Sequence, residues 1–300
     1  MKWQGVFPAI TTKFRADGSV DLEAVEADVA FQFEAGADAI ICCGSLGEAS
    51  TLEPDEKIAI AETAKRAAGK RPVLLTIAED STRAAIGMAR RAEKAGLHGL
   101  MVLPAMRYVA TPREVIVHFR AVAQATGLDI MIYNNPIAYG MDVTAPMLAE
   151  MADEERFVAV KESSGDVRRL TDIVNLIGGR YAVFSGVDDL AMESLMLGAV
   201  GWVAGLVCAF PQETVAIYRL MQAGRIAEAR EIYRWFMPLL HLDVSLRFVQ
   251  NIKLVEHLVR GTSPAVRAPR LELIGAEKAA VEAVVAAALK NRPQLPKLAA

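Results

Sequence analysis

The chain has 300 residues, of which 53% are hydrophobic and 23% are charged, and its formal net charge is −3. This composition indicates a globular protein with a large core and excludes a disordered or fibrous chain. No basic block is present, so we expect neither nucleic acid nor an anionic membrane as a partner. No run reaches the ~18 apolar residues of a membrane span, and the start lacks a signal-peptide pattern, so we expect a cytoplasmic protein.

Short apolar runs rich in β-branched residues alternate with longer amphipathic segments along the chain. These runs are predicted to be strands buried on both faces. They begin at Gly5, Ala39, Pro72, Gly99, Asp129, Phe157, Tyr181 and Val200. The first three segments between them carry helix start and stop signals. The start signals are Asp21, Pro54 and Ser81, and the stop signals are Gly36, Gly69 and Gly96.

A strand followed by a helix, eight times, predicts a parallel (β/α)8 barrel, the TIM barrel of the α/β class. An open doubly wound sheet is the alternative. It is disfavoured because no GxGxxG follows the first strand and no composition shift marks a second domain. We expect residues 1–224 to form the barrel and residues 225–300 to form a C-terminal helical extension packed on it, within one structural domain.

Cysteine and histidine spacing predicts neither a disulfide framework nor a metal site. Cys42, Cys43 and Cys208 show no CxxC spacing and are best explained as small buried hydrophobic residues. The four histidines are far apart, and none forms an HxH or HExxH pattern. We therefore expect no metal.

In a (β/α)8 barrel, functional groups come from the carboxyl ends of the strands. Two reactive side chains occupy such ends: Tyr133 in "YNNP" and Lys161 in "VAVKESSGD". They end consecutive strands, so we expect them to be neighbours. An apolar barrel mouth favours the neutral amine, which is the form that attacks a carbonyl to make a Schiff base. A tyrosine beside it can transfer protons.

Each residue also has an ordinary structural explanation. A strand-end lysine followed by glutamate is usually a solvated ion pair, and a tyrosine in "MIYNNP" is more often a cap on the core. The loop "GSLGEAS" from Gly44 is a weak turn signal, although its N–H groups beside a helix N-terminus suit a carboxylate. Their combination at the ends of strands two, five and six favours a catalytic site.

The motifs "GSLGEAS", "YNNP" and "VAVKESSGD", in that order and spacing, resemble the dihydrodipicolinate synthase / N-acetylneuraminate lyase family. The resemblance covers nearly the whole chain, from "GVFPAITTKF" through "FSGVDD" to the C-terminal helices. It implies a (β/α)8 class I Schiff-base enzyme acting on pyruvate or another 2-oxo acid. It also implies that no organic cofactor is needed, and that the chain assembles as a homo-oligomer, a dimer or a tetramer.

The resemblance assigns roles to matching positions. Lys161 resembles the Schiff-base lysine, Tyr133 the general acid/base, and Ser45 the hydroxyl residue that relays protons to that tyrosine. The amides of Gly44 to Gly47 match the family's carboxylate cradle. Gly186 resembles the strand-seven glycine beside the pocket for the substrate tail.

Departures from the synthase subgroup concern the pocket. Leu46 replaces a second loop hydroxyl, and Ala138, beside Tyr139, stands where the subgroup has an arginine for the second substrate's carboxylate. Met106 occupies the region of a relay aromatic from the adjacent subunit, so Tyr108 or Tyr139 is a hypothetical replacement. We expect Leu46, Met106, Ala138 and Tyr139 to line a small, rather apolar pocket, which fits neither lysine biosynthesis nor a polyhydroxylated sugar acid.

The segments "YNNPIAYG…DVT" and "SGVDD" most resemble family members associated with 4-hydroxyproline catabolism. Those convert 1-pyrroline-4-hydroxy-2-carboxylate to 2-oxoglutarate semialdehyde and ammonia, and we expect this deaminase activity. The enzyme alternatives are a pyruvate-dependent aldolase or dehydratase of 2-oxo-3-deoxy sugar acids and a dihydrodipicolinate-synthase-like enzyme. A silent paralogue that only binds 2-oxo acids is the non-enzyme alternative.

Overall fold

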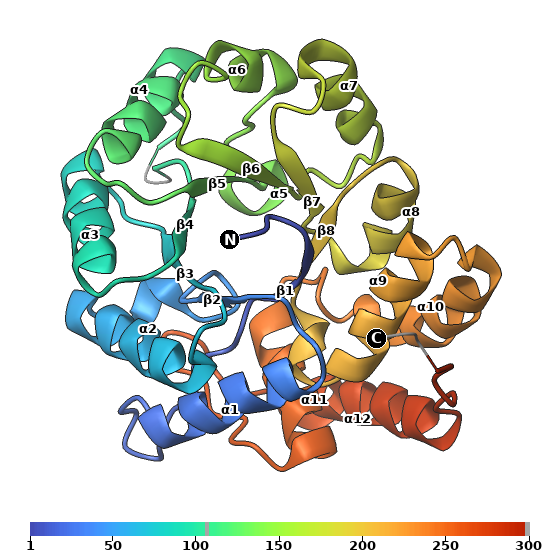
Figure 1. The fold of residues 1–300 in the computed structure, drawn as a ribbon. Helices are drawn as coiled ribbons and strands as arrows, with labels where there is room; N and C mark the ends of the chain where they lie inside the picture. The colour runs from blue at the N-terminus through green and yellow to red at the C-terminus, as the bar shows by residue number, and fades with distance from the viewer. Residues whose placement is uncertain (106–107, 298–300) are drawn as a thin grey trace.

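The computed structural model describes residues 1–105 and 108–297. In this part of the chain, eight parallel strands form one sheet in the order β1-β8-β7-β6-β5-β4-β3-β2 (Figure 1). A parallel bridge from Ala9 to Ile41 joins its two edges. The predicted (β/α)8 barrel is therefore confirmed. The strands are β1 (Gly5–Pro8), β2 (Ile40–Cys42), β3 (Val73–Ile77), β4 (Gly99–Val102), β5 (Ile130–Asn134), β6 (Phe157–Glu162), β7 (Ala182–Ser185) and β8 (Gly201–Ala204).

Helices alternate with the strands and surround the barrel (Figure 1). Asp21 and Ser81 cap α1 and α3 as predicted, since each side chain accepts a hydrogen bond from a first-turn N–H group. The helices are α1 (Leu22–Glu34), α2 (Pro54–Ala68), α3 (Thr82–Lys94), α4 (Pro112–Ala123), α5 (Pro136–Tyr139), α6 (Ala145–Glu150), α7 (Arg168–Ile177), α8 (Ala191–Met196) and α9 (Pro211–Gln222). Short 3₁₀ helices follow three strands: η1 (Ala49–Thr51), η2 (Asp188–Leu190) and η3 (Leu206–Cys208).

The strands separate two apolar layers. On β3, for example, Leu74 belongs to the layer inside the barrel, whereas Val73 and Leu75 belong to the layer under the helices. This follows from the alternation of side chains along a strand. Trp3 packs against the inner layer, and the N-terminus lies over the centre of the ring (Figure 1). Because β1 starts at this end, the amino ends of the strands are covered here and the mouth is at the opposite end.

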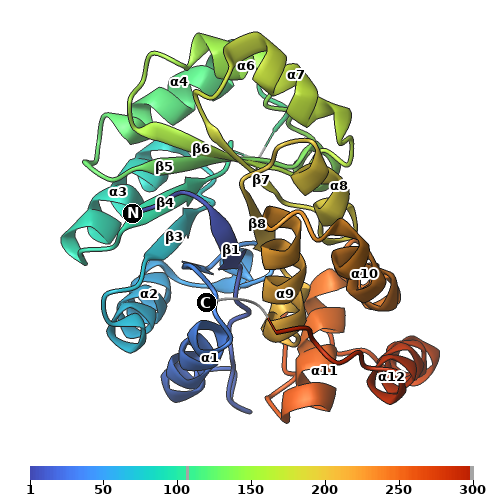
Figure 2. The ribbon, with the colours of Figure 1, turned by 45° about the vertical axis from the view of Figure 1, so that its right-hand side comes forward.

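Three further helices follow α9 and lie on its side of the barrel (Figures 1 and 2). They are α10 (Ile226–Leu240), α11 (Phe248–Arg260) and α12 (Gly275–Lys290). Glu256 of α11 accepts hydrogen bonds from Thr11 at 2.7 Å and Lys13 at 2.5 Å, just beyond β1. The extension is thereby joined to the carboxyl end of the barrel. No helix of the described residues is long and apolar enough to cross a membrane.

Candidate active site

Lys161 and Tyr133 are direct register partners on β6 and β5. The Nζ atom of Lys161 lies 4.1 Å from the centroid of the Tyr133 ring. The two side chains are only 7% and 4% exposed, and Tyr133 belongs to the apolar layer inside the barrel. The predicted proximity of the amine and the phenol is confirmed, while their chemical roles stay predictions.

Glu162 does not form the solvated ion pair that is the usual explanation of a strand-end lysine. Its buried carboxylate accepts hydrogen bonds from Asn134 Nδ2 at 3.0 Å and from the backbone N–H of Ser164 at 2.6 Å. Burial raises the pKa of Glu162 above its ordinary value. The bond from Asn134 ties the end of β5 to the end of β6, and so stabilises the register that places Lys161 beside Tyr133.

Gly186, immediately after β7, lies against the stem of Lys161. A Cβ atom on Gly186 would be 2.7 Å from both Cγ and Cε of Lys161, and it would collide with the Oγ atom of Ser163. The backbone N–H of Gly186 donates to the carbonyl of Glu162 at 2.9 Å. Only glycine therefore leaves room for the lysine on its present path. The contact places Gly186 beside the predicted Schiff-base residue.

Tyr139 connects the loop after β2 with Tyr133. Its hydroxyl group is in hydrogen-bond contact with the hydroxyl group of Ser45. Its ring meets the ring of Tyr133 edge to face, with centroids 6.0 Å apart and an interplanar angle of 85°. Burial, and then the neighbouring Tyr133 hydroxyl, raise the pKa of Tyr139 above its ordinary value. Of the two hypothetical relay replacements, Tyr139 lies at the site, whereas Tyr108 is 61% exposed.

The side chain of Asn135 positions α5. Its Nδ2 donates to the Tyr133 hydroxyl at 3.0 Å, and its Oδ1 accepts from the backbone N–H of Ala138 at 3.0 Å. This N-cap bond holds the short helix that carries Tyr139 directly over Tyr133. Ala138 itself is exposed, so its side chain is not among those gathered around Lys161.

The Gly44–Gly47 loop is held in an uncommon backbone conformation. The residues that flank it, Cys43 and Glu48, both have left-handed φ angles, of 56° and 58°. Such residues cost of order 1–3 kcal/mol each and persist only when their surroundings hold them in place. A Cβ atom on Gly47 would be 3.0 Å from the carbonyl oxygen of Ile10, so this position also requires close backbone approach.

Glu48 anchors this loop to the C-terminal extension. Its carboxylate accepts hydrogen bonds from Lys253 Nζ at 2.5 Å and from the backbone N–H of Arg267 at 3.1 Å. Both Glu48 and Lys253 are 0% exposed. Removing one partner of such a buried pair typically costs about 3–5 kcal/mol, so the extension helps to hold the loop in place.

Besides Ala138, a second expected pocket residue, Leu46, does not face Lys161. The side chain of Leu46 is buried in the apolar layer between strands and helices. Met106 lies outside the described residues. Gly44 does face the mouth, since a Cβ atom there would lie 3.5 Å from Oγ1 of Thr76 on β3.

Thr76 and Ser163 are site residues that the sequence reasoning missed. Their hydroxyl groups are buried and have no hydrogen-bond partner among the described residues. A buried unsatisfied polar group costs about 1–3 kcal/mol, which a ligand atom would relieve. Thr76 lies beside Gly44, and Ser163 lies beside Gly186 and Lys161. Neither carries a sequence signal, because threonine is common in strands and serine in turns.

A hollow of about 530 Å³ adjoins this site on the side of Ser45 and Tyr139. Its wall also includes Lys57, Glu79 and Arg270, and Arg270 comes from the segment between α11 and α12. The C-terminal extension therefore contributes a cation to this wall. No sequence pattern had pointed to Arg270, because its position depends on how the chain returns to the barrel.

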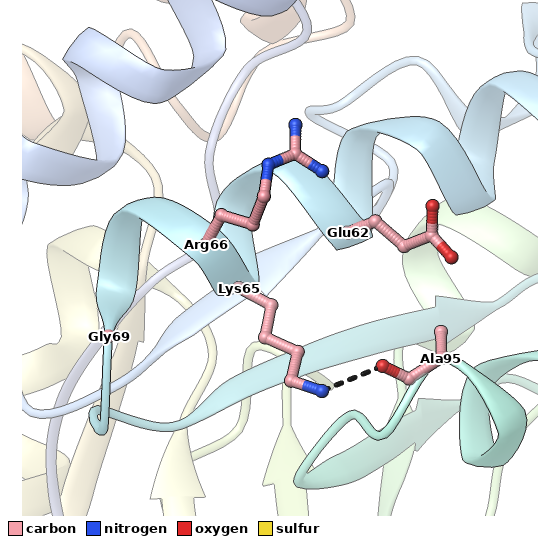
Figure 3. A pocket seen from close by; sticks show the side chains of 5 residues that line it. All are labelled: Glu62, Lys65, Arg66, Gly69 and Ala95. Carbon is pink, nitrogen blue, oxygen red and sulfur yellow. Dashed lines mark hydrogen bonds between the residues drawn. The ribbon is translucent and has the colours of Figure 1, made fainter.

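A separate hollow of about 330 Å³ lies between the last turn of α2 and the end of α3 (Figure 3). It contains none of the candidate residues, and Lys65 Nζ donates there to the carbonyl of Ala95 at 2.8 Å. In a (β/α)8 barrel these helix ends lie at the amino end of the strands, opposite the mouth. Within residues 1–105 and 108–297, no three His, Cys, Asp or Glu side chains gather as a metal site.

The barrel, the buried strand-end lysine and the adjacent tyrosine are the arrangement of a class I, lysine Schiff-base enzyme. Residues 2–288 match the model of the dihydrodipicolinate synthetase family, and the chain belongs to this family. It is an enzyme of the class I aldolase and lyase type that acts on pyruvate-type substrates.

Individual relatives agree with this assignment. The chain is 31% identical over 287 residues to a 4-hydroxy-tetrahydrodipicolinate synthase of Geotalea uraniireducens, covering 94% of this chain and 98% of the relative. The structure of the synthase from Methylacidiphilum fumariolicum SolV has 26% identity, 96% coverage of both chains and a TM-score of 0.92. YagE, a prophage protein of the family from E. coli K12 in complex with pyruvate, has 26% identity, coverage of 95% and 98%, and a TM-score of 0.90.

Proposed function

We propose that the chain is a 1-pyrroline-4-hydroxy-2-carboxylate deaminase that releases ammonia and 2-oxoglutarate semialdehyde. The observation that carries the proposal is the contact between Tyr139 and Ser45. It links the loop after β2 to Tyr133 through hydroxyl groups of one chain. Position 138 carries alanine instead of an arginine, and Arg270 supplies the cation on this wall. A single-substrate reaction needs no second carboxylate at Arg270, whereas a synthase does, so the condensation assay below separates the two.

The first steps form a Schiff base. The amine of Lys161 adds to C2 of the cyclic imine, and the C2–N bond of the ring then breaks. The ring nitrogen becomes an amine on C5, and C2 is left doubly bonded to the lysine nitrogen. The amides of the Gly44–Gly47 loop and the free hydroxyl of Thr76 are proposed to hold the substrate carboxylate.

The protonated imine then acidifies the C3 proton, and removal of that proton expels the 4-hydroxyl as water. Tyr133 transfers these protons, because it is the phenol next to Lys161. Proton shifts along the chain convert the C5 amine to an imine. One water hydrolyses this imine and releases ammonia, and a second water frees the product from Lys161. One water is lost and two are consumed, so the net reaction uses one water.

The same first steps serve a retro-aldol reaction on a 2-oxo-3-deoxy acid, so the test compares products. Purified enzyme is given the hydroxylated pyrroline carboxylate, and ammonia is measured with a coupled dehydrogenase assay. Parallel reactions measure pyruvate released from 2-oxo-3-deoxy sugar acids and condensation of pyruvate with aspartate semialdehyde. We expect ammonia release to have the highest kcat/KM. Absence of ammonia together with rapid sugar-acid cleavage or condensation would overturn the proposal.

A further inference from the structure

The turn after α10 brings the carboxylate of Asp243 to the barrel mouth. Gly205 follows β8, and a Cβ atom on it would lie 2.8 Å from Cγ of Asp243 and collide with its carboxylate oxygens. The carboxylate therefore rests on the bare Cα of Gly205. The arrangement parallels the neighbouring strand end, where Gly186 leaves room for Lys161. Two successive strands are thus each followed by a glycine, one against the candidate nucleophile and one against an acid.

Asp243 is within electrostatic reach of Lys161. Burial raises the pKa of Asp243 well above its ordinary value, the carboxylate of Asp188 raises it further, and Lys161 opposes the rise. Asp243 therefore lies where it would interact with a charged group bound at the mouth.

The two nearby acids differ from Asp243 because they have partners. Asp188 accepts hydrogen bonds from Trp202 Nε1 at 2.9 Å and from the backbone N–H of Leu206 at 2.8 Å. Asp189 pairs with His241 at 2.9 Å. Within residues 1–105 and 108–297, no hydrogen bond reaches the carboxylate of Asp243. Asp188 and Asp189 are thus engaged in holding the structure together, and Asp243 is free to meet a ligand.

A second observation marks the same corner as ligand-facing. The Oγ atom of Ser163 is buried, with 3% exposure of the residue, and has no partner among the described residues. It lies over Gly186 next to Cε of Lys161. A polar group with no protein partner beside the reacting amine is expected to contact the bound substrate. A substrate tail in contact with Ser163 would extend toward β7 and β8, where Asp243 lies.

We propose that Asp243 is a specificity-determining residue that binds a basic nitrogen at the tail of the 2-oxo acid substrate. The inference rests on the proposed function, in which ring opening leaves an amine on C5. This amine takes a proton from solvent, and the resulting ammonium forms an ion pair with the carboxylate of Asp243. A hydroxylated tail without nitrogen would leave the acid without a charged partner.

The test uses two probes of equal carbon length. 1-Pyrroline-2-carboxylate, the ring form of 5-amino-2-oxopentanoate, presents a tail nitrogen after ring opening, and 2-oxopentanoate does not. Each is titrated against the enzyme with borohydride, and modified Lys161 is quantified by peptide mass spectrometry. We expect the enzyme to trap the nitrogen probe at lower concentration. In the Asp243→Asn variant, the ratio of trapping efficiency for the nitrogen probe to that for 2-oxopentanoate should fall roughly 10- to 100-fold. Trapping of 2-oxopentanoate itself should be unchanged.

Glu231→Gln is the matched control, because it removes one carboxylate from an exposed position of α10. It should keep the preference. An unchanged preference in Asp243→Asn would overturn the inference. Loss of trapping with both probes would also overturn it, because it would make Asp243 a positioning residue for Lys161. If the enzyme releases no ammonia but prefers the nitrogen probe through Asp243, the proposed deaminase fails and the inference stands. If ammonia is released and the preference does not depend on Asp243, the inference alone fails.

Discussion

The hydroxyl group of Tyr139 contacts the hydroxyl group of Ser45, although the two residues are 94 positions apart in the chain. Tyr139 closes the short helix α5, and Ser45 lies in the loop after β2. The contact joins two strand ends on different sides of the mouth through a side chain that also meets the ring of Tyr133. A single chain thereby holds a continuous series of hydroxyl groups that ends beside Lys161.

Replacing Tyr139 with Phe should lower kcat by roughly 10- to 100-fold, because proton transfer through a positioned side chain contributes on this scale or above it. Trapping of pyruvate by Lys161 should persist, since the amine is untouched. The measurement is steady-state turnover beside borohydride trapping. Tyr108→Phe is made in parallel, because Tyr108 is 61% exposed on this chain and stands in the region of the adjacent-subunit aromatic. Loss of turnover in Tyr108→Phe alone would assign the relay to Tyr108. Unchanged turnover in both variants would contradict a relay through either tyrosine.

Pyruvate with borohydride should modify Lys161 and no other lysine, which peptide mass spectrometry can establish. Lys161→Ala should abolish the adduct and lower kcat/KM by roughly 1,000-fold or more, because the covalent route is lost. Lys65 lines the hollow at the opposite end of the barrel. The Lys65→Met variant should therefore form the Lys161 adduct and turn over substrate like the parent enzyme. An unmodified Lys161 in the parent enzyme would show that the Schiff-base assignment is wrong.

Gly186→Ala should slow Schiff-base formation by at least about tenfold, because the new Cβ atom would lie 2.7 Å from two carbon atoms of Lys161. The rate of borohydride-trapped adduct formation at saturating pyruvate is the readout. Gly179→Ala provides a matched control, since a Cβ atom there has no atom within 4 Å and its φ is not left-handed. Equal trapping rates in the two variants would contradict the role of Gly186 in placing the lysine.

The buried pair of Lys253 and Glu48 makes a prediction about pH. Burial lowers the pKa of Lys253 from 10.5 to about 8, although Glu48 opposes this. Between these values the unfolded chain binds a proton that the folded protein does not, so the free energy of unfolding rises with pH across this window. The rise is measured by urea unfolding against the double variant Glu48→Gln/Lys253→Met, which lacks both titrating groups. If the parent's free energy of unfolding, relative to the double variant, falls between pH 8 and 10, the effect of Glu48 on the pKa of Lys253 is larger than that of burial.

Much of the fold was predictable because its signals are local. The alternation of buried strands and amphipathic helices, the caps Asp21 and Ser81, and the eight strand positions all lie in short segments. Consecutive strands of a parallel barrel end side by side, and this alone predicted that Tyr133 and Lys161 are neighbours. The path of each loop was less predictable. Leu46 occupies a site-loop position, yet its side chain packs in the outer apolar layer, beside a backbone that turns through left-handed residues.

The sequence by itself determined the barrel and the pair of reactive groups at its mouth, since periodicity and chain order are sufficient for both. Only the tertiary structure decided what surrounds that pair. Lys253 reaches Glu48 from 205 residues away, and Asp243 covers Gly205 from beyond α10. Such contacts depend on how the C-terminal extension returns to the mouth, and no local pattern encodes that return. The side chains around Lys161 are therefore supplied by long-range packing, whereas short motifs already identify the lysine itself.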